Sequence, residues 1–432
     1  MSDHNNKAEF FFAKILFFLL PLHALLVTVL NFKLEVTEVP LLITAWKEIV
    51  IALLTVFAIV NIVRKKTTLR IDTVSVLILL YLGLGILSYF VHEYEFGLKQ
   101  WIFGMRFDFS FLIAFLIFRH LGFSENQRAQ LIKLLLLSSA IAVGYGLLTF
   151  VVFLFVDPAM LTYLGFRNDW STFIPGEALA FCQRLENTGF CRLQSTFAGP
   201  NQYGIFLVFL AGAVWFSSFK EISILRYKNN LLATIAISLL LTLSRSAWIG
   251  FMAAVGMAVV VFYGDEIKNS IKKRRAMLMV VMVSMVIMAV AALTIPSVRH
   301  AIIRPGSTSG HFQNAYIATE RMWKHPFGEG LATVGPASSY FHKPGEAFHP
   351  ENWYLQVGIE MGWIGMALFL AIIVLMAQRL FKERLKMSAG VPLGKIALFG
   401  LCGIAIAGLF LHSFEDAPTT LLIFSVIGMA LL

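Results

Sequence analysis

The sequence has 432 residues and a formal net charge of +10, and 58% of its residues are hydrophobic while only 14% are charged. A soluble domain of this length carries far more charged surface, so the composition excludes a soluble protein. The positive charge does not indicate nucleic-acid binding either, because the lysines and arginines gather in a few short loops between apolar runs.

Apolar runs of about 18 residues or more recur along the chain, which is typical of an all-α, polytopic membrane protein. Lys7 and Lys14 precede the first run without a small-residue cleavage site after it, so no cleavable signal peptide is predicted. We expect about twelve transmembrane helices in a single integral membrane domain over residues 1–432. They cover roughly residues 10–30, 40–63, 71–91, 99–118, 129–156, 199–219, 230–244, 246–263, 276–295, 353–378, 394–412 and 417–432.

Cationic residues separate the two sides of the predicted membrane. The five inner loops, 64–70, 119–128, 220–229, 264–275 and 379–395, together hold 19 lysines and arginines. The short outer loops 31–39, 92–98 and 413–416 hold only Lys33 and several acids. Positive charge is retained on the cytoplasmic side of membrane proteins, so both termini are predicted to be cytoplasmic.

One arginine interrupts an otherwise apolar stretch. Arg245 is the only charged residue among the 33 residues from Leu231 to Tyr263. That length is too great for one ordinary span and suits two short helices joined by a tight turn. We therefore expect residues 242–246 to form a hairpin tip at the outer face, which presents Arg245 outside the hydrocarbon.

Two outer loops are long, residues 157–198 and 296–352, and long ordered loops are usually functional. The first loop contains Cys182 and Cys191 in an oxidising compartment, which favours a disulfide. Two free thiols in a folded loop are the alternative. No histidine lies near the pair, so a zinc site is not predicted there.

The segment that follows these cysteines contains three residues of interest. Pro200 and Asn201 stand before an apolar run and are typical of the first turn of a helix. Arg192, eight residues earlier, lies at the membrane boundary. Two interpretations stay open for it, an interfacial anchor or a contact to a ligand.

The second long loop carries Arg321 in a helical pattern that ends at Pro326, and Arg321 either pairs with a neighbouring acid or binds a ligand. His349 lies at the start of the following span, where Asn352 is a candidate helix cap. The loop holds five histidines, but no HxH or HExxH spacing indicates a metal, and no metal or other cofactor is predicted.

Arg192, Arg245, Arg321 and His349 come from four places but share one predicted membrane face. One guanidinium group can donate hydrogen bonds to two phosphate oxygens at once, and a neutral histidine can accept a proton from a hydroxyl. The combination favours transfer of a group from a lipid-linked diphosphate to an alcohol.

At these residues the sequence resembles the O-antigen ligase superfamily, which includes lipopolysaccharide O-antigen ligases, surface polysaccharide polymerases and some protein oligosaccharyltransferases. The matching stretches occur in the family's order across residues 190–370. They are RLQSTFAGPNQYG, the SR of TLSRSAWIG, RMWKHPFGEG and HPENWYLQVGIEMGWIG.

The resemblance implies a GT-C-like glycosyltransferase of the bacterial inner membrane, with a large periplasmic loop between helices 9 and 10. Its donor is a glycan on undecaprenyl diphosphate, it needs no metal, and its acceptor is lipid A-core, a growing glycan or a protein. By position, Arg245 and Arg321 bind the diphosphate and His349 is the general base, with Arg192, Asn201, Glu351 and Asn352 as further substrate contacts. Attack opposite the leaving group predicts inversion at the anomeric carbon.

One feature departs from the family pattern. Many ligases place asparagine directly after the histidine, whereas Pro350 and Glu351 intervene here. This leaves Glu351 as an alternative base, and the form is closer to that of polysaccharide polymerases than to that of lipopolysaccharide ligases.

A transporter or flippase is the alternative function from another class. Lys47 and Glu48 lie in the second predicted span and Arg106 and Asp108 in the fourth, and intramembrane charges often mark a transport pathway. Each span, however, contains one cation and one acid close together. We therefore expect these side chains to form ion pairs that hold helices together. A sensor or assembly protein is less favoured still, since no inner loop exceeds about 17 residues.

Overall fold

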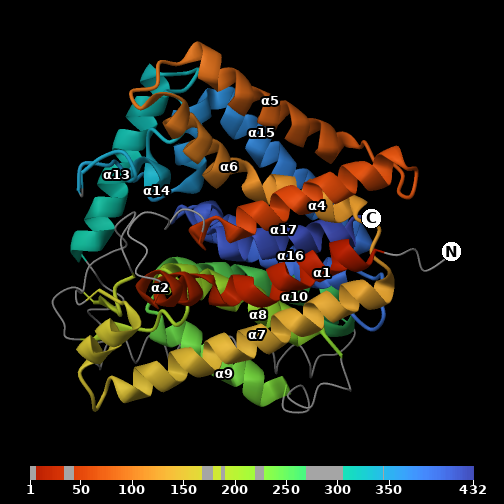
Figure 1. The fold of residues 1–432 in the computed structure, drawn as a ribbon, viewed down its shortest axis with the longest axis horizontal. Helices are drawn as coiled ribbons and strands as arrows, with labels where there is room; N and C mark the ends of the chain where they lie inside the picture. Colours follow the sequence, from red (N-terminus) through yellow and green to blue (C-terminus); the bar gives the residue numbers. More distant parts are fainter. Residues whose placement is uncertain are drawn as a thin grey trace.

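The computed structural model describes residues 6–33, 43–167, 179–185, 190–218, 228–268, 305–343 and 345–432. Helices dominate this part of the chain (Figure 1). The first half contains α1 (Lys7–Leu19), α2 (His23–Lys33), α4 (Trp46–Val63), α5 (Thr73–Val91), α6 (Gly97–His120) and α7 (Glu125–Val152). The second half contains α8 (Pro200–Phe216), α9 (Lys228–Leu241), α10 (Arg245–Lys268), α13 (Pro305–Lys324), α14 (Gly335–Ser338), α15 (Trp353–Glu383), α16 (Leu393–Ala407) and α17 (Ala417–Ala430).

Seven of these segments are long and apolar enough to cross a membrane, by length and composition. They are Lys7–Phe32, Trp46–Val63, Thr73–Val91, Gly97–His120, Glu125–Val152, Arg245–Tyr263 and Trp353–Glu383. Four shorter apolar helices, α8, α9, α16 and α17, coincide with further predicted spans. The predicted span 276–295 lies outside the described residues.

Two predicted spans are interrupted. In the first, Pro21 lacks a backbone N–H, and the 3₁₀ turn Leu20–Leu22 separates α1 from α2. In the tenth, Gly362 has φ 69° and ψ −173°, which breaks α15 into two helical parts. A Cβ on Gly362 would lie 2.3 Å from the carbonyl oxygen of Pro326, so the break accommodates the loop before it. The predicted span over residues 353–378 is thus present within α15, with a break at Gly362 that the sequence pattern did not predict.

The first long outer loop departs from a purely α-helical structure. It contains a 3₁₀ segment, Pro158–Leu164, and two short antiparallel strands, β1 (Gln183–Arg184) and β2 (Cys191–Arg192), with Arg184 opposite Cys191. Strands this short depend on the surrounding contacts, which periodicity in the sequence does not reveal.

The core is continuous through most helices. Small residues bring α10 and α16 together, since a Cβ on Gly250 would lie 2.6 Å from the carbonyl oxygen of Gly403. This close approach of backbones is a common device in membrane helix pairs. Nearer the site, Phe111, Phe369, Phe414 and Trp353 pack their rings within 6.3 Å of one another between α6, α15 and the segment before α17.

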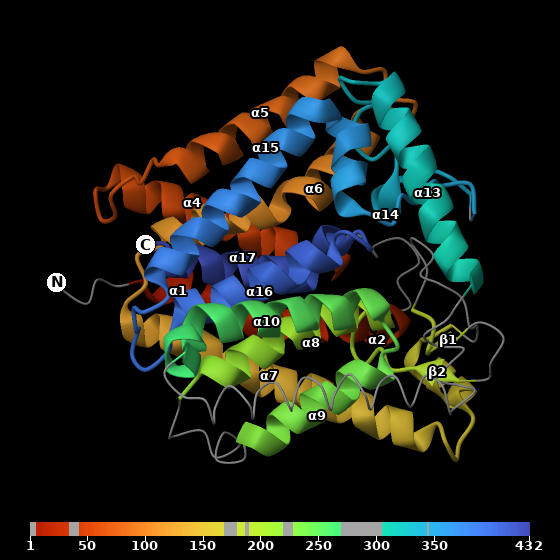
Figure 2. The same cartoon turned by 180° about the vertical axis from the view of Figure 1, so that it is seen from behind.

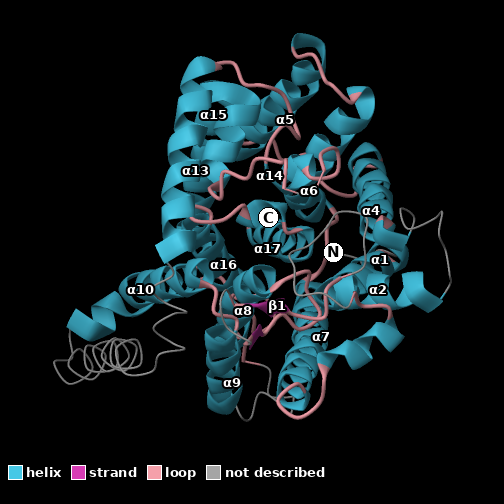
Figure 3. Cartoon of the chain, turned by 90° about the vertical axis from the view of Figure 1, so that its left-hand side faces the viewer, coloured by secondary structure: helices cyan, strands magenta, loops and turns pink. Residues whose placement is uncertain are grey.

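The two termini lie at one end of the helix bundle, and the elements with candidate site residues lie at the other. Figure 2 shows the turn between α9 and α10, the β1–β2 hairpin, α13 and α14 on the side away from the N- and C-terminal labels. Figure 3 views the molecule from this second end. Residues far apart in the sequence therefore meet at one end of the protein.

At the end with the termini, Asp72 joins three helices, and we predict that Asp72→Asn destabilises the fold. Asp72 caps α5 by accepting from the backbone N–H of Ser75 (2.9 Å) and pairs with Arg119 of α6 and Arg379 of α15. Burial opposes its ionisation, but the contact with Arg119 outweighs burial and holds the pKa of Asp72 well below its ordinary value. We expect the free energy of unfolding to fall by about 2 kcal/mol.

Thermal unfolding in detergent checks this prediction, with the exposed carboxyl variant Glu93→Gln at the other end as the control. A depressed pKa in the folded state means that the stabilisation is present above pH 3.8 and declines as the pH falls below it. The difference between wild type and Asp72→Asn should shrink over that acid range. A variant as stable as wild type at neutral pH would contradict the role of Asp72.

Candidate functional site

The turn between α9 and α10 forms the hairpin tip that the sequence predicts. Helix α9 ends at Leu241, Leu243 takes a left-handed conformation with φ 50°, and α10 begins at Arg245. The Thr242 hydroxyl stabilises the turn by donating to the carbonyl of Leu239 (2.6 Å) and accepting from the N–H of Ser244 (3.2 Å). Arg245 is half-buried in the first turn of α10, which contains no acidic residue.

Arg192 holds this hairpin tip in place. Its Nε donates to the carbonyl of Thr242 (2.9 Å), and one of its terminal nitrogens donates to the carbonyl of Leu243 (3.4 Å) and to Oδ1 of Asn201 (2.8 Å). Both carbonyls belong to the turn that follows α9, so this guanidinium ties the turn to the segment before α8. Arg192 and Asn201 therefore act on the tip, and Asn201 also lies in the first turn of α8.

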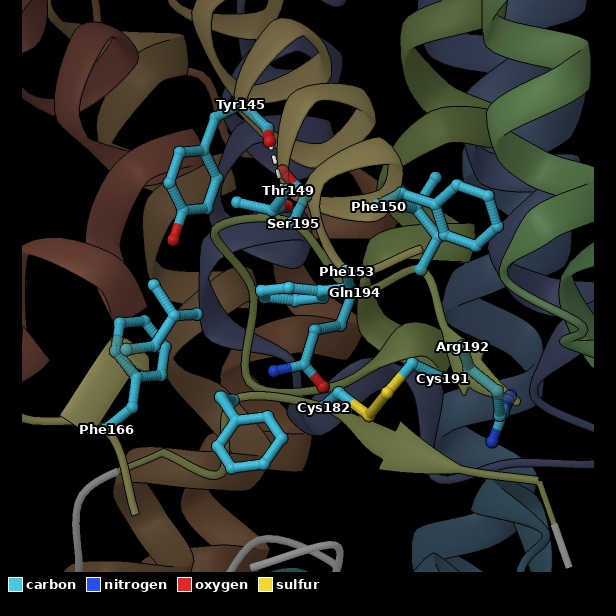
Figure 4. A pocket seen from close by; sticks show the side chains of 13 residues that line it. Tyr145, Thr149, Phe150, Phe153, Phe166, Cys182, Cys191, Arg192, Gln194 and Ser195 are labelled. Atoms are coloured by element: carbon cyan, nitrogen blue, oxygen red, sulfur yellow. Dashed lines mark hydrogen bonds between the residues drawn. A yellow bond between two sulfur atoms is a disulfide. The ribbon is translucent and has the colours of Figure 1, made fainter. Parts of the chain in front are cut away.

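The β1–β2 hairpin gives Arg192 its position. The structure joins Cys182 and Cys191 in a disulfide, and Gln194 donates to the carbonyl of Ala180 (2.8 Å) across the same loop. Figure 4 shows Arg192 pointing away from the small cavity beside the disulfide, with the amide of Gln194 near Cys182 and Ser195 next to Thr149. That cavity has about 20 Å³, room for about one water molecule, so it is too small for a substrate.

We predict that Arg192→Lys impairs the function of the hairpin tip, measured as the rate of the reaction that the site supports, without unfolding the protein. A lysine offers one point charge and cannot contact Thr242, Leu243 and Asn201 together. The tip would then move, and misplacing a binding group by about 1 Å costs on the order of 100-fold in rate. Turnover should be compared with that of Arg184→Lys on the neighbouring strand, and equal rates for the two variants would refute this positioning role.

Arg321 lies near the end of α13 and is already paired. Its Nε donates to Oε1 of Glu329 (3.1 Å), a terminal nitrogen pairs with Oε2, and the guanidinium lies 5.3 Å from the ring of Phe348. Of the two interpretations of Arg321, the structure shows the pairing with a neighbouring acid. A phosphate would have to compete with Glu329 for the Arg321 guanidinium.

Backbone contacts with the broken helix hold Glu329 in place. The N–H of Glu329 donates to the backbone carbonyl of Ile359 (2.8 Å), and the N–H of Gly330 donates to the backbone carbonyl of Glu360 (3.1 Å). Gly328 has φ 93°, and a Cβ there would lie 2.5 Å from the carbonyl of Glu360. The glycines of RMWKHPFGEG thus allow the loop to dock on α15 just before its break at Gly362.

His349 lies just before α15 and is half-buried, and both its side chain and its backbone carbonyl have partners. Its Nε2 is 3.0 Å from the hydroxyl of Ser339, and its carbonyl accepts from the side chain of Asn314 (3.1 Å). Burial lowers the pKa of His349 below its ordinary value of 6.5, although nearby Glu351 acts in the opposite direction. The imidazole is therefore neutral at pH 7 and able to accept a proton.

Glu351 and Asn352 have partners of their own. Glu351 has φ 51° and lies 2.6 Å from Nδ1 of His311 on α13. Burial opposes its ionisation, but the contact with His311 prevails, and the pKa of Glu351 is lowered. Asn352 caps α15 by accepting from the N–H groups of Tyr354 and Leu355, and its amide donates to the carbonyl of Leu409 (3.0 Å).

His412 is a residue that sequence reasoning missed. Its ring centroid lies 6.0 Å from that of His349, and burial, with the nearby His349, lowers its pKa to about 3. It stands in the segment between α16 and α17, which also contains Glu415 and Asp416. A signal was present, because HSFED is the polar interruption between the last two apolar runs.

His412 faces a cavity of about 290 Å³, the size of a small ligand site. The cavity lies among α2, α4, α6, the segment before α8, and the segment between α16 and α17. Lys47, Glu48 and Arg106 line it, and Glu48 lies 3.2 Å from the Lys47 ammonium and 2.6 Å from Nε of Arg106. These intramembrane charges pair as expected.

Asp108 differs from that expectation. It is buried beside Glu360 of α15, and the partner of Arg106 is Glu48. The reason is the helical spacing, since residues two apart point in different directions. Among the residues that the structure describes, no group of three or more histidine, cysteine or acidic side chains is placed to hold a metal ion.

The site residues thus form two groups at one end of the protein. Arg192, Asn201 and the Arg245 tip form the first, and Arg321, His349, Glu351 and Asn352 surround the junction of α13 and α15. The family model for O-antigen ligases matches residues 231–370. This confirms the resemblance, and the match includes Arg245 as well as the second group.

Together with the apolar helices, the O-antigen ligase match indicates a membrane enzyme that processes glycans. The matched residues run from α9 into the second part of α15, and so include the hairpin tip and the loop that docks on α15. No curated protein matches the chain.

Proposed function

We propose that this protein transfers a glycan from an undecaprenyl-diphosphate carrier to an acceptor hydroxyl at the outer face of the bacterial inner membrane. The observation that carries this proposal is His349, a half-buried, neutral imidazole within the O-antigen ligase match, close to His412 and the cavity that His412 lines. The lysines and arginines are concentrated in the predicted inner loops. This distribution supports a cytoplasmic location for both termini and an outer location for the site.

The reaction needs a base for the acceptor. In the proposed step, Nε2 of His349 takes the proton of the acceptor hydroxyl as its oxygen forms a bond to the anomeric carbon. The bond between that carbon and the phosphate oxygen breaks, and the polyprenyl diphosphate leaves with the electron pair. Because attack comes from the opposite side, the anomeric centre inverts, and a retained linkage in the product would contradict this step.

The reaction also needs positive charge on the leaving diphosphate. Arg245 lies in the first turn of the 24-residue helix α10, where backbone N–H groups and the helix dipole favour an anion. Its fork would bind phosphate oxygens, and Arg321 would join it by exchanging Glu329 for the diphosphate. These charges suffice for the leaving group, so the proposal requires no metal.

The remaining predicted contacts receive supporting roles. Arg192 and Asn201 hold the tip that carries Arg245, and Asn352 fixes the start of α15 beside His349. Glu351 holds His311 against the same junction. The acceptor is lipid A-core, a growing glycan or a protein, and the first test separates these.

The test is release of polyprenyl diphosphate by the purified full-length protein in liposomes with a lipid-linked oligosaccharide and EDTA. Release with donor alone, accompanied by a growing glycan ladder, is the result for a polymerase. Release only after addition of lipid A-core or a protein identifies a ligase or an oligosaccharyltransferase. No release with any acceptor, or equal release by His349→Ala, would contradict the proposal and favour a transporter.

A further inference from the structure

The exposed side of α13 carries a stripe of aromatic side chains. Phe312, Tyr316 and Trp323 are 74%, 72% and 68% exposed. Their spacing of four and seven residues places them within about 40° of one another around the helix. Phe327, in the turn after α13, is exposed as well. Large aromatic side chains gathered on one side of a helix mark a contact with another apolar surface.

The rest of α13 divides into two further sectors. One sector packs inside the protein, where Ala318 and Met322 are buried in an apolar cluster shared with α15. The other sector is polar and exposed, with Gln313, Glu320 and Lys324, and the last two form an ion pair at 2.6 Å. At 100° per residue, the aromatic stripe lies between the buried and the polar sectors. The uncovered part of α13 is therefore amphipathic.

The direction of α13 differs from that of the spanning helices. Figure 1 draws α4, α7 and α17 mainly from side to side, whereas α13 runs from top to bottom in both Figure 1 and Figure 3. It lies at the end of the bundle away from the termini (Figure 2), and it is not among the described helices that are apolar enough to cross a membrane. An amphipathic helix that lies across the ends of spans has the orientation of a helix in the membrane interface.

The stripe continues onto the surfaces of two spanning helices. Trp323 lies 4.8 Å, between ring centroids, from Trp363 of α15, and the next residue, Ile364, is exposed. On the other side, Phe90 and Val91, the last residues of α5, are exposed immediately before a loop that contacts the turn after α13. Both α5 and α15 are long and apolar enough to span the bilayer. The stripe is thus continuous with side chains that face lipid.

The composition of the stripe fits lipid better than it fits a soluble ligand. Tyrosine and tryptophan concentrate at the headgroup level of membranes, where the ring is in an apolar layer and its polar atom meets water. Phe312 and Phe327 have no polar atom in their side chains and gain from contact with acyl chains. A small ligand or a glycan needs a concave site with convergent polar groups, whereas this stripe lies on the convex surface of a single helix.

We propose that the aromatic stripe, formed by Phe312, Tyr316, Trp323 and Phe327, inserts into the bilayer leaflet at this end of the protein and anchors the second long loop on the membrane surface. The polar sector of α13 then faces water. Arg321 lies on the side of the helix away from the stripe, so it is held roughly 10 Å, one helix diameter, from the inserted side chains. The anchor fixes the height of the α13–α15 junction over the bilayer, whether or not the protein transfers a glycan.

The experiment measures the depth of single nitroxide labels on the full-length protein in phosphatidylcholine vesicles. Cys402, the free cysteine, is replaced by serine, and one new cysteine is introduced at a time. Phe312→Cys and Tyr316→Cys report on the stripe, while Gln313→Cys and Lys324→Cys in the polar sector of the same helix are the matched controls. Relaxation of each label by oxygen, which concentrates in lipid, is compared with relaxation by a water-soluble nickel complex. The stripe labels should respond more strongly to oxygen, and the control labels more strongly to nickel.

Two results would overturn the proposal. Stripe labels that respond to nickel as strongly as the Gln313→Cys label would place the stripe in water. Stripe labels that respond weakly to both reagents would place it against protein, either a second copy of this chain or another partner. Thermal unfolding in detergent verifies the fold of each variant, and the two stripe positions give independent readings. Glycan transfer is not measured, so failure of the proposed function would not alter the result.

Discussion

Replacing Arg245 by lysine should leave the protein folded and lower the rate of glycan transfer by about 100- to 1000-fold, the range for losing one group that stabilises transition-state charge. Arg245 stands where α10 begins, after a turn closed by Thr242 and clamped by Arg192. A lysine keeps the charge but presents it as a point, so it cannot contact two oxygens of one diphosphate as a guanidinium fork does. If charge develops on the diphosphate only as the bond breaks, kcat and kcat/KM should fall together.

The control for this substitution is Arg64→Lys, the same change at an exposed residue near the opposite end of the bundle. Release of polyprenyl diphosphate is measured for both variants, with thermal unfolding in detergent to verify the fold. Arg64→Lys should match wild type. Wild-type release by folded Arg245→Lys would remove Arg245 from the diphosphate site.

The second large effect is expected for His349→Ala, which should reduce transfer by about 100- to 10,000-fold, the usual contribution of a general base. Only the neutral imidazole accepts a proton, and burial places the pKa of His349 below 6.5. The wild-type rate should therefore be constant above about pH 6.5 and fall as the pH decreases through the lowered pKa.

The same pH profile distinguishes His349 from Glu351 as the base. The pKa of Glu351 lies below 4.5, so a Glu351 base would keep its full rate to a lower pH. We expect Glu351→Gln to retain most of the transfer rate and the acid limb, because its carboxylate is held by His311. Loss of transfer in Glu351→Gln, with activity retained in His349→Ala, would assign the base to Glu351.

Individual residues show which predictions were within reach of the sequence. The hairpin tip at Arg245 was predictable because 33 apolar residues exceed one span and a single charge marked the turn. The cap at Asn352 and the helix start at Pro200 were also predictable, since capping depends on residues close in sequence. The breaks at Pro21 and Gly362 were missed because both lie inside apolar runs that continue past them.

Contacts between distant residues were the harder part. Nothing in the sequence shows that Glu329 is the partner of Arg321, or that Arg192 binds the carbonyls of Thr242 and Leu243 fifty residues later. Such pairs depend on how loops and helices dock. His412 was overlooked for the same reason, since its proximity to His349 exists only once α15, α16 and α17 have packed.

The sequence by itself determined that this is a helical membrane protein, and its four motifs were sufficient to predict the O-antigen ligase resemblance. Hydrophobic length, charge asymmetry and local motifs are properties of short stretches, and the bilayer acts on them directly. Only the tertiary structure decided which arginines are paired inside the protein and which distant segments line the cavity beside His412. Those outcomes depend on packing between segments hundreds of residues apart, where the cost of burying a polar atom is settled by its three-dimensional neighbours.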